Sequence, residues 1–322
     1  MLLQEEGGSP GVLAARMRMR ERLRWGLLML LSVFAYGSHA PLLALCRVDG
    51  ELPFATSSVV LATELTKLGA SAALLLGRDW PSLPPSAPPL SAVLPFALPA
   101  ALYALNNNLA VHMQGSMDPV TFQVLGNLKI MATAVARCLL LRQPLSARRW
   151  AALALLVVSG ACHAGAANQA RGGPEEPVRL FITPLGAAAI ALYCSVSGLA
   201  ATLTEHALKS QPFPLSLQNL FLYSFGAIAN LVAYLAGPPT AGFFQGFSPV
   251  VGVIIASQAL NGLLMSAIMK HDSSITRLFI ISCSMLVNAG LSVLLFHLRL
   301  TPLFFLAACL ICFAIHLYYH VR

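Results

Sequence analysis

Residues 249–296 read PVVGVIIASQALNGLLMSAIMKHDSSITRLFIISCSMLVNAGLSVLLF. The short polar segment Lys270 to Ser274 separates two apolar runs that carry almost no charge. A helix needs about 20 mostly apolar residues to cross a bilayer. The stretch therefore predicts two membrane-spanning helices joined by a tight turn.

The composition of the whole chain agrees with this interpretation. The 322 residues are 57% hydrophobic and only 10% charged, with a mean hydropathy of +0.74. Soluble domains carry about 25% charged residues, so the chain has too few polar groups to cover a water-soluble fold or to remain unfolded in water. The net charge of +8 is scattered at the ends of apolar runs, which favours the lipid bilayer over nucleic acid as the partner.

Ten apolar windows along the chain are long enough to cross a membrane, so we predict an all-α membrane protein with ten transmembrane helices. The windows lie at 26–46, 57–77, 90–112, 118–141, 148–166, 181–205, 216–237, 249–269, 274–296 and 300–320. The breaks between them are rich in Gly, Pro and Asp, as at Asp118-Pro119 and Gly237-Pro238-Pro239. The first window follows a basic tail at 1–25 and is too long for a signal peptide.

The distribution of basic residues orients these helices. With the N-terminus in the cytosol, thirteen Lys and Arg residues fall on the cytosolic side and four on the other. This bias follows the positive-inside rule, so both termini are expected in the cytosol. Arg277 is counted here among the cytosolic charges.

Five predicted helices at 26–166 precede a polar lumenal loop at 167–180, and five follow at 181–322. Because five is odd, two homologous halves would be inverted relative to each other, as in many secondary transporters. A weak internal match supports the repeat, since Asn107 to Asp118 and Asn261 to Asp272 have the same spacing of eleven residues. We therefore predict two inverted five-helix repeats.

Three basic residues, Lys67, Lys129 and Arg137, lie inside the predicted spans, where a charge costs about 2.5–3.5 kcal/mol. Glu64 and Lys67 are three residues apart on one helix face and can form an ion pair, with either a structural or a cavity role. Lys129 has no acidic neighbour within a turn of its own helix. It follows Gln123 and Asn127 on one polar stripe and needs an anion, unless it extends to the membrane surface.

Amide side chains form the most unusual polar cluster, at Asn106, Asn107 and Asn108 in the third span. Amides both donate and accept hydrogen bonds, which suits a nucleobase edge or a sugar hydroxyl, although they also bond helices together. In the second half the polar residues are Ser197, Glu205, Gln218, Asn219 and Tyr223, and Lys270 ends the eighth span.

The charges suggest the class of ligand. If Glu64 neutralises Lys67, then Lys129 and Lys270 leave about two positive charges in a cavity. A nucleotide diphosphate sugar, or a nucleoside monophosphate above its second pKa near 6, carries about two negative charges. The sequence has no Walker-type phosphate loop, no HExxH motif and no catalytic carboxylate pair, so we expect neither an enzyme nor a metal or cofactor site. Cys309 and Cys312 are interpreted as packing residues.

Short motifs in chain order carry a family resemblance. They are TELTKL at 63–68, YALNNN at 103–108, FQV at 122–124, LKI at 128–130, SG at 197–198, Glu205, LK at 208–209, NLFLY at 219–223, NGL at 261–263 and MK at 269–270. At these residues the chain resembles the nucleotide-sugar transporters of the Golgi and endoplasmic reticulum, in the A subfamily of solute carrier family 35 within the drug/metabolite transporter superfamily.

The resemblance implies an antiporter of the Golgi membrane that exchanges a pyrimidine nucleotide sugar for a nucleoside monophosphate. The family's substrate contacts correspond here to Asn107, Asn108, Phe122, Gln123, Lys129, Ser197, Asn219, Tyr223 and Lys270, with Glu64 and Lys67 beside the sugar. Where the family usually has Tyr, this chain has Phe122, which lacks the hydroxyl. That departure motivates an alternative function, a non-transporting scaffold or regulator that forms hetero-oligomers with related transporters; a homo-oligomer is also considered.

Overall fold

A computed structural model describes residues 10–48, 52–83, 86–113, 117, 119–171, 182–237, 242–297 and 299–320 of the chain. These residues are almost entirely helical, and between them only an isolated antiparallel bridge joins Met117 to Ile182. The predicted all-α fold is thereby confirmed. The Asn108 side chain and most of the loop at 167–180 lie outside the described residues.

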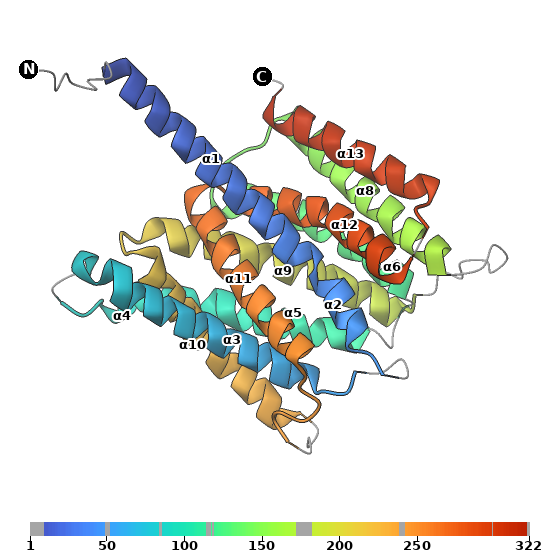
Figure 1. Cartoon of the computed structure of the whole chain (residues 1–322), viewed down its shortest axis with the longest axis horizontal. Helices are drawn as coiled ribbons and strands as arrows, with labels where there is room; N and C mark the ends of the chain where they lie inside the picture. Colours follow the sequence, from blue (N-terminus) through green and yellow to red (C-terminus); the bar gives the residue numbers. More distant parts are fainter. Residues whose placement is uncertain are drawn as a thin grey trace, which may run out of the picture.

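The helices run back and forth through a single bundle, and both chain ends lie at its upper side in Figure 1. In the first half they are α1 (Pro10–Gly37), α2 (His39–Leu45), α3 (Thr56–Leu74), α4 (Leu90–Val93), α5 (Ala97–Met113), α6 (Pro119–Gly126), α7 (Lys129–Leu140) and α8 (Ala147–Arg171). In the second half they are α9 (Pro184–Ser210), α10 (Leu215–Ala236), α11 (Pro249–His271), α12 (Ser274–Phe296) and α13 (Pro302–Tyr319). A π-turn (Leu75–Asp79) and 3-10 turns (Trp80–Ser82, Leu94–Phe96) extend α3 and precede α5.

Within the described residues, nine helical segments are long and apolar enough to cross a membrane. They coincide with nine of the ten predicted windows. The window at 118–141 is instead divided between α6 and α7. The division falls at Asn127, whose side-chain amide donates to the Gln123 carbonyl at 2.8 Å, after Gly126, which weakens the helix.

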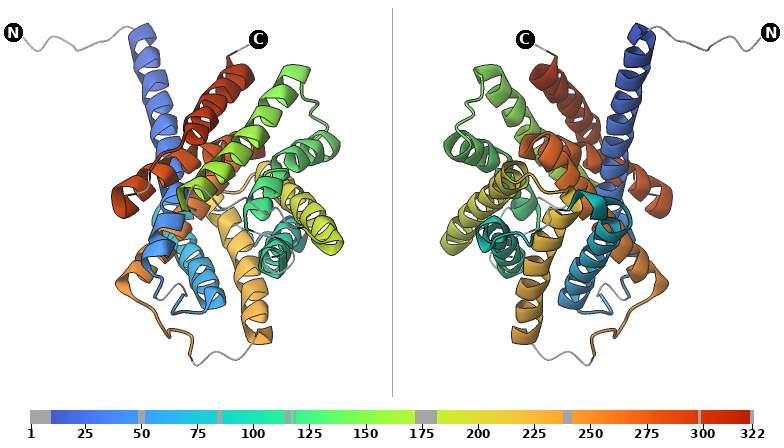
Figure 2. Two further views of the ribbon diagram at one scale, coloured as in Figure 1. Left: turned by 90° about the vertical axis from the view of Figure 1, so that its right-hand side faces the viewer. Right: turned by 90° about the vertical axis from the view of Figure 1, so that its left-hand side faces the viewer.

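The helix contacts follow a regular plan. Among the described helices, α3 packs along α10 and α8 along α13. Helix α9 lies against α5 and α7, and α1 lies against α11 and α12. Helix α5 also contacts α10, and α3 contacts α11. Figure 2 shows the long, steeply inclined helices of both halves interleaved around the middle of the bundle.

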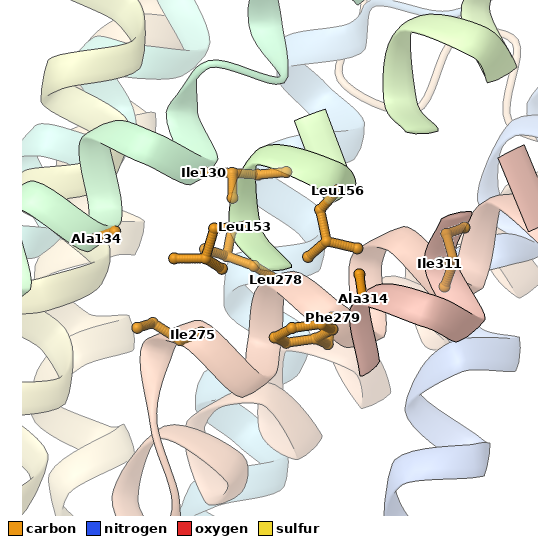
Figure 3. Packing of buried hydrophobic residues seen from close by; sticks show 9 residues of the cluster. All are labelled: Ile130, Ala134, Leu153, Leu156, Ile275, Leu278, Phe279, Ile311 and Ala314. Carbon is orange, nitrogen blue, oxygen red and sulfur yellow. The ribbon is translucent and has the colours of Figure 1, made fainter. Parts of the chain in front are cut away.

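Apolar packing holds the periphery together. In Figure 3, buried side chains of α7, α8, α12 and α13 meet in one cluster: Ile130, Ala134, Leu153, Leu156, Ile275, Leu278, Phe279, Ile311 and Ala314. Large apolar residues also point outward, and Leu185 and Leu294 are each 74% exposed. Between membrane helices the attraction comes from close van der Waals packing, while outward leucines contact lipid tails.

A charged cluster joins three helices at the end of the bundle where the chain ends lie. Both carboxylate oxygens of the fully buried Glu205 accept from Arg137 Nη1 at 2.7 Å, and Lys209 Nζ donates to Oε1 at 2.7 Å. The backbone and hydroxyl of Ser274 donate to Oε2 at 2.8 and 2.7 Å. This cluster links α7, α9 and the start of α12, and we call it the Glu205 cluster.

Candidate functional site

A polar cavity of about 430 Å³ lies between α1, α3, α5, α10, α11 and α12. Its wall includes four predicted site residues, Glu64, Lys67, Asn107 and Tyr223. Asn261 also lines it, so the two asparagines that begin the matched spacings of the sequence lie on one cavity.

The predicted ion pair is confirmed. Lys67 Nζ lies 2.6 Å from Glu64 Oε1, and the two side chains are only 13% and 16% exposed. Lys67 also stands over the Tyr223 ring, with its nitrogen 4.5 Å from the ring centre. A Cβ at Gly226 would lie 2.9 Å from Glu64 Oε2, and one at Gly262 would lie 2.6 Å from Lys67 Cδ. Glycines on α10 and α11 thus make the room that the pair occupies.

A smaller cavity of about 180 Å³ adjoins the first and shares Asn107 with it. Lys129 and Ser197, both predicted site residues, line this second cavity together with Asn106. Lys129 stands at the start of α7 and is half-buried. Among the described residues its ammonium has no ion-pair partner.

Arg277 corrects the sequence analysis, which assigned it to the cytosolic charges. It lies in the first turn of α12 and lines both cavities. Its Nη1 donates to the Tyr103 hydroxyl at 2.5 Å, while its buried Nε has no partner among the described residues. The positive-inside count could not detect this because Arg277 is only three residues from the predicted helix start at Ser274.

A third cavity of about 220 Å³ lies beside Lys129, where α1 gives way to α2 and α6 to α7. Phe122 and Gln123, both predicted site residues, line it with Tyr193 of α9. The Phe122 and Tyr193 rings are 5.6 Å apart and inclined by 54°. Two aromatic rings and several amides therefore line a space large enough to hold a small planar ring.

A fourth cavity of about 350 Å³ shares Gln123, His163 and Asn288 with the third. Its wall continues to Ala44 and Arg299, which lie near helix ends opposite the chain termini. The four cavities are therefore neighbours in a series, and the wall of the small central cavity includes Ser274 of the Glu205 cluster.

Two predicted site residues lie outside the walls of these four cavities. Lys270 Nζ donates to the Phe213 carbonyl at 2.7 Å and to Gln218 Oε1 at 2.8 Å. The protein itself therefore accepts two of the hydrogen bonds that this ammonium can donate. Asn219 is buried on α10, and its Oδ1 has no partner among the described residues. The Asn108 side chain lies outside the described residues. For all three, contact with a substrate stays a prediction.

The charge of the first three cavities is unbalanced. Among the described residues in their walls, Glu64 is the one acidic residue and is paired with Lys67, so Lys129 and Arg277 together leave two positive charges. Two positive charges were predicted, but the second comes from Arg277 instead of Lys270. Cations inside a membrane protein usually face a partner or an aqueous path, so these two favour an anionic ligand. The described residues hold no group of three or more His, Cys, Asp or Glu that could bind a metal.

Comparison with known proteins agrees with the motifs of the sequence. The model of the nucleotide-sugar transporter family matches residues 43–319. Proteins named "Probable UDP-sugar transporter protein SLC35A4" are similar over the full length. The one from Sus scrofa is 52% identical and the one from Homo sapiens 51% identical, each over 99% of both chains. The one from Danio rerio is 49% identical over 92% of this chain and 94% of its own.

A solved crystal structure has a similar fold. It aligns with a TM-score of 0.65 at 12% identity and covers 91% of this chain and 95% of the other. At this identity the likeness concerns the fold alone.

Proposed function

Since the chain belongs to the nucleotide-sugar transporter family, we propose that it exchanges a cytosolic pyrimidine nucleotide sugar, UDP-, CMP- or CDP-linked, for a lumenal nucleoside monophosphate across the Golgi membrane. UDP-linked sugars are the first candidates because the relatives carry the name of probable UDP-sugar transporters. The observation that carries the proposal is the pair of unneutralised cations, Lys129 and Arg277, in the wall of one small cavity.

The charge of the site matches both ligands of an exchange. A diphosphate sugar carries about two negative charges, as does a monophosphate above its second pKa near 6. A cavity with two positive charges accommodates either without net movement of charge. Export of the monophosphate down its gradient would then drive uptake of the sugar nucleotide.

The positions of the cavities suggest how the substrate lies. We place the phosphates at Lys129 and Arg277, in the small central cavity. The base fits the third cavity, between Phe122 and Tyr193, because aromatic walls and amides suit a planar heterocycle. The sugar fits the largest cavity, beside Glu64 and Lys67, where charged and amide groups can bond several hydroxyls.

The helix contacts support ten spans in two inverted repeats, with α6 and α7 together as the fourth span. In an inverted repeat each span of the first half corresponds to the one five positions later in the chain, so α5 corresponds to α11 and α9 to α1. The contact between α5 and α9 then corresponds to the contact between α11 and α1. The contact of α7 with α9 becomes that of α12 with α1, and α10 with α5 becomes α3 with α11. An even number of spans also agrees with both termini on one side, which we take to be the cytosol.

Exchange in liposomes tests the function. Purified protein in vesicles loaded with UMP or CMP should take up labelled UDP-, CMP- or CDP-linked sugars or alditols. Vesicles loaded with AMP, or left empty, provide the control and should take up little. If a broad panel of nucleotide sugars shows no uptake above empty vesicles, exchange is not the function of this protein.

The scaffold alternative makes the opposite prediction for nucleotides. Phe122 is the residue that motivates it, because a lost hydroxyl could mark a degraded site. A scaffold needs no unneutralised cations in a cavity, so its thermal stability should not respond to UMP or CMP. A transporter should be stabilised by UMP or CMP and not by AMP or GMP.

A further inference from the structure

We propose that the Tyr193 hydroxyl binds the nucleotide where the base joins the sugar phosphate, and so replaces the hydroxyl that Phe122 lacks. The proposal rests on the proposed function, because it takes the third cavity as the base site and the small central cavity as the phosphate site. Tyr193 is therefore inferred to be a substrate-binding residue contributed by α9.

The position of Tyr193 between the two cavities is the first argument. Phe122 lines the third cavity alone, whereas Tyr193 lines both the third cavity and the small central cavity that holds Lys129 and Arg277. The two rings are in contact, with centroids 5.6 Å apart, but they come from different helices, α6 and α9. A ligand that spans both cavities lies against the wall that they share, to which Tyr193 contributes with Tyr36, Lys129 and Ile281.

The state of the hydroxyl is the second argument. Two other tyrosine hydroxyls have partners: that of Tyr103 accepts from Arg277, and that of Tyr319 lies 2.8 Å from Thr276 Oγ1. Tyr193 is half-buried, yet among the described residues its hydroxyl makes no hydrogen bond. Because polar groups inside proteins are nearly always bonded, an unpartnered hydroxyl on a cavity wall is available to a ligand.

The chemistry fits the junction. A phenol hydroxyl can donate to a phosphate oxygen or to a ribose hydroxyl, and its ring offers a face to the base. Phe122 retains the ring face but has no donor. A single tyrosine at position 122 would both pack against the base and donate a hydrogen bond. Here Phe122 of α6 supplies the packing, and Tyr193 of α9 supplies the hydrogen bond.

A double-mutant cycle tests the replacement. UMP binding is measured on the purified full chain by titration calorimetry, together with the melting temperature without ligand. Tyr193→Phe should weaken UMP binding about tenfold, since a hydrogen bond to a charged group is lost. Adding Phe122→Tyr to that variant should bring the affinity back to within about threefold of the original. Tyr318→Phe, a hydroxyl on α13 outside the cavities, should leave binding unchanged.

The outcomes separate this inference from the proposed function. Equal UMP affinity of Tyr193→Phe and the unaltered protein, or no recovery in the double variant, overturns the inference while nucleotide binding stands. If the unaltered protein binds neither UMP nor CMP, both the inference and the proposed function are wrong. A fall in the ligand-free melting temperature that accounts for the lost binding would mark Tyr193 as a packing residue and also overturn the inference.

Discussion

The Glu205 cluster and the central cavities use the same kinds of charged residues with opposite results. Around Glu205, two cations, a backbone amide and a hydroxyl surround one buried carboxylate, and both of its oxygens are bonded. At the cavities, the one carboxylate is used by Lys67, and Lys129 and Arg277 remain unneutralised. Residue type alone does not separate these two regions. The difference is whether the protein supplies the counter-charge. Where it does, as at Glu205, the charges stabilise the fold, and where it does not, as at the cavities, the charges are available to a ligand.

The largest effect should come from breaking the satisfied region. Glu205→Gln leaves the largely buried Arg137 and the more exposed Lys209 without their counter-ion, and losing one member of a buried ion pair costs about 3–5 kcal/mol. The melting temperature and the yield of folded protein should fall sharply. UMP affinity in the protein that survives should change little. An unaltered melting temperature would remove the distinction between the two regions.

The unsatisfied region should behave in the reverse manner. Lys129→Ala should weaken UMP binding by about 2–5 kcal/mol, well over tenfold, because a buried charge-assisted contact is lost. The ligand-free melting temperature should stay or rise, since an unpaired cation has been removed. Lys129→Arg should also bind less well, because a planar guanidinium does not replace a compact ammonium.

Lys270 gives the matched control for Lys129. Its ammonium is bonded to Phe213 and Gln218 outside the four cavities. Lys270→Ala should therefore lower the melting temperature and leave UMP affinity nearly unchanged. If UMP still binds to Lys129→Ala but not to Lys270→Ala, the two roles are reversed. Lys270 would then be a phosphate contact and Lys129 a structural residue.

A smaller effect should follow from crowding the ion pair of the cavity. The Cβ of Gly262→Ala would lie 2.6 Å from Lys67 Cδ, so Lys67 must move or about 1–3 kcal/mol of strain is stored. Uptake of nucleotide sugar in the liposome assay should fall several-fold. Gly252→Ala on the same helix meets nothing within 4 Å and should leave uptake unchanged. Equal uptake by both variants would show that the position of Lys67 does not matter.

The smallest effect concerns a neutral bond near the Glu205 cluster. Tyr319→Phe removes the contact with Thr276 Oγ1, which also lies 3.0 Å from Ser273 Oγ and so keeps a partner. We expect a loss of about 1 kcal/mol in stability and unchanged UMP binding, measured by thermal melting with and without UMP. Altered UMP binding would mean that this end of the bundle takes part in ligand recognition.

The parts of the fold and site that depend on local sequence could be predicted. Hydropathy identified the windows of the nine long spans, because apolar length decides whether a helix can cross a membrane. The Glu64–Lys67 pair followed from helical spacing. The Gly126-Asn127 dipeptide was a local signal for the division of the window at 118–141 into two helices, but the apolar character of the window concealed it.

The remainder depends on contacts distant in sequence. Arg137 and Glu205 are 68 residues apart, so no spacing rule could pair them, and Arg137 looked as unusual as Lys129 until its partner was known. Arg277 lies at a helix start, where hydropathy and charge rules classify an arginine as a loop residue. The packing of α12 against α1, and the bond from Arg277 to the Tyr103 hydroxyl of α5, direct it to a cavity. The same holds for Tyr193, which has only apolar residues next to it along its helix and so gives no local signal.

The glycines of the bundle carry a consequence for inherited variation. Gly37 approaches Ser284, Gly198 approaches Thr133, Gly226 approaches Glu64 and Gly262 approaches Lys67, each at less than 3 Å from an added Cβ. Every one of these contacts joins a helix of the series α1 to α8 to a helix of the series α9 to α13. Any missense change at these four codons adds at least one carbon to this boundary, whereas Gly69 or Gly290 has open space around it. Gly160 is as crowded, by Asn127 of the same half, so damaging glycine alleles should gather at these five positions and be rare at the open glycines of the same helices.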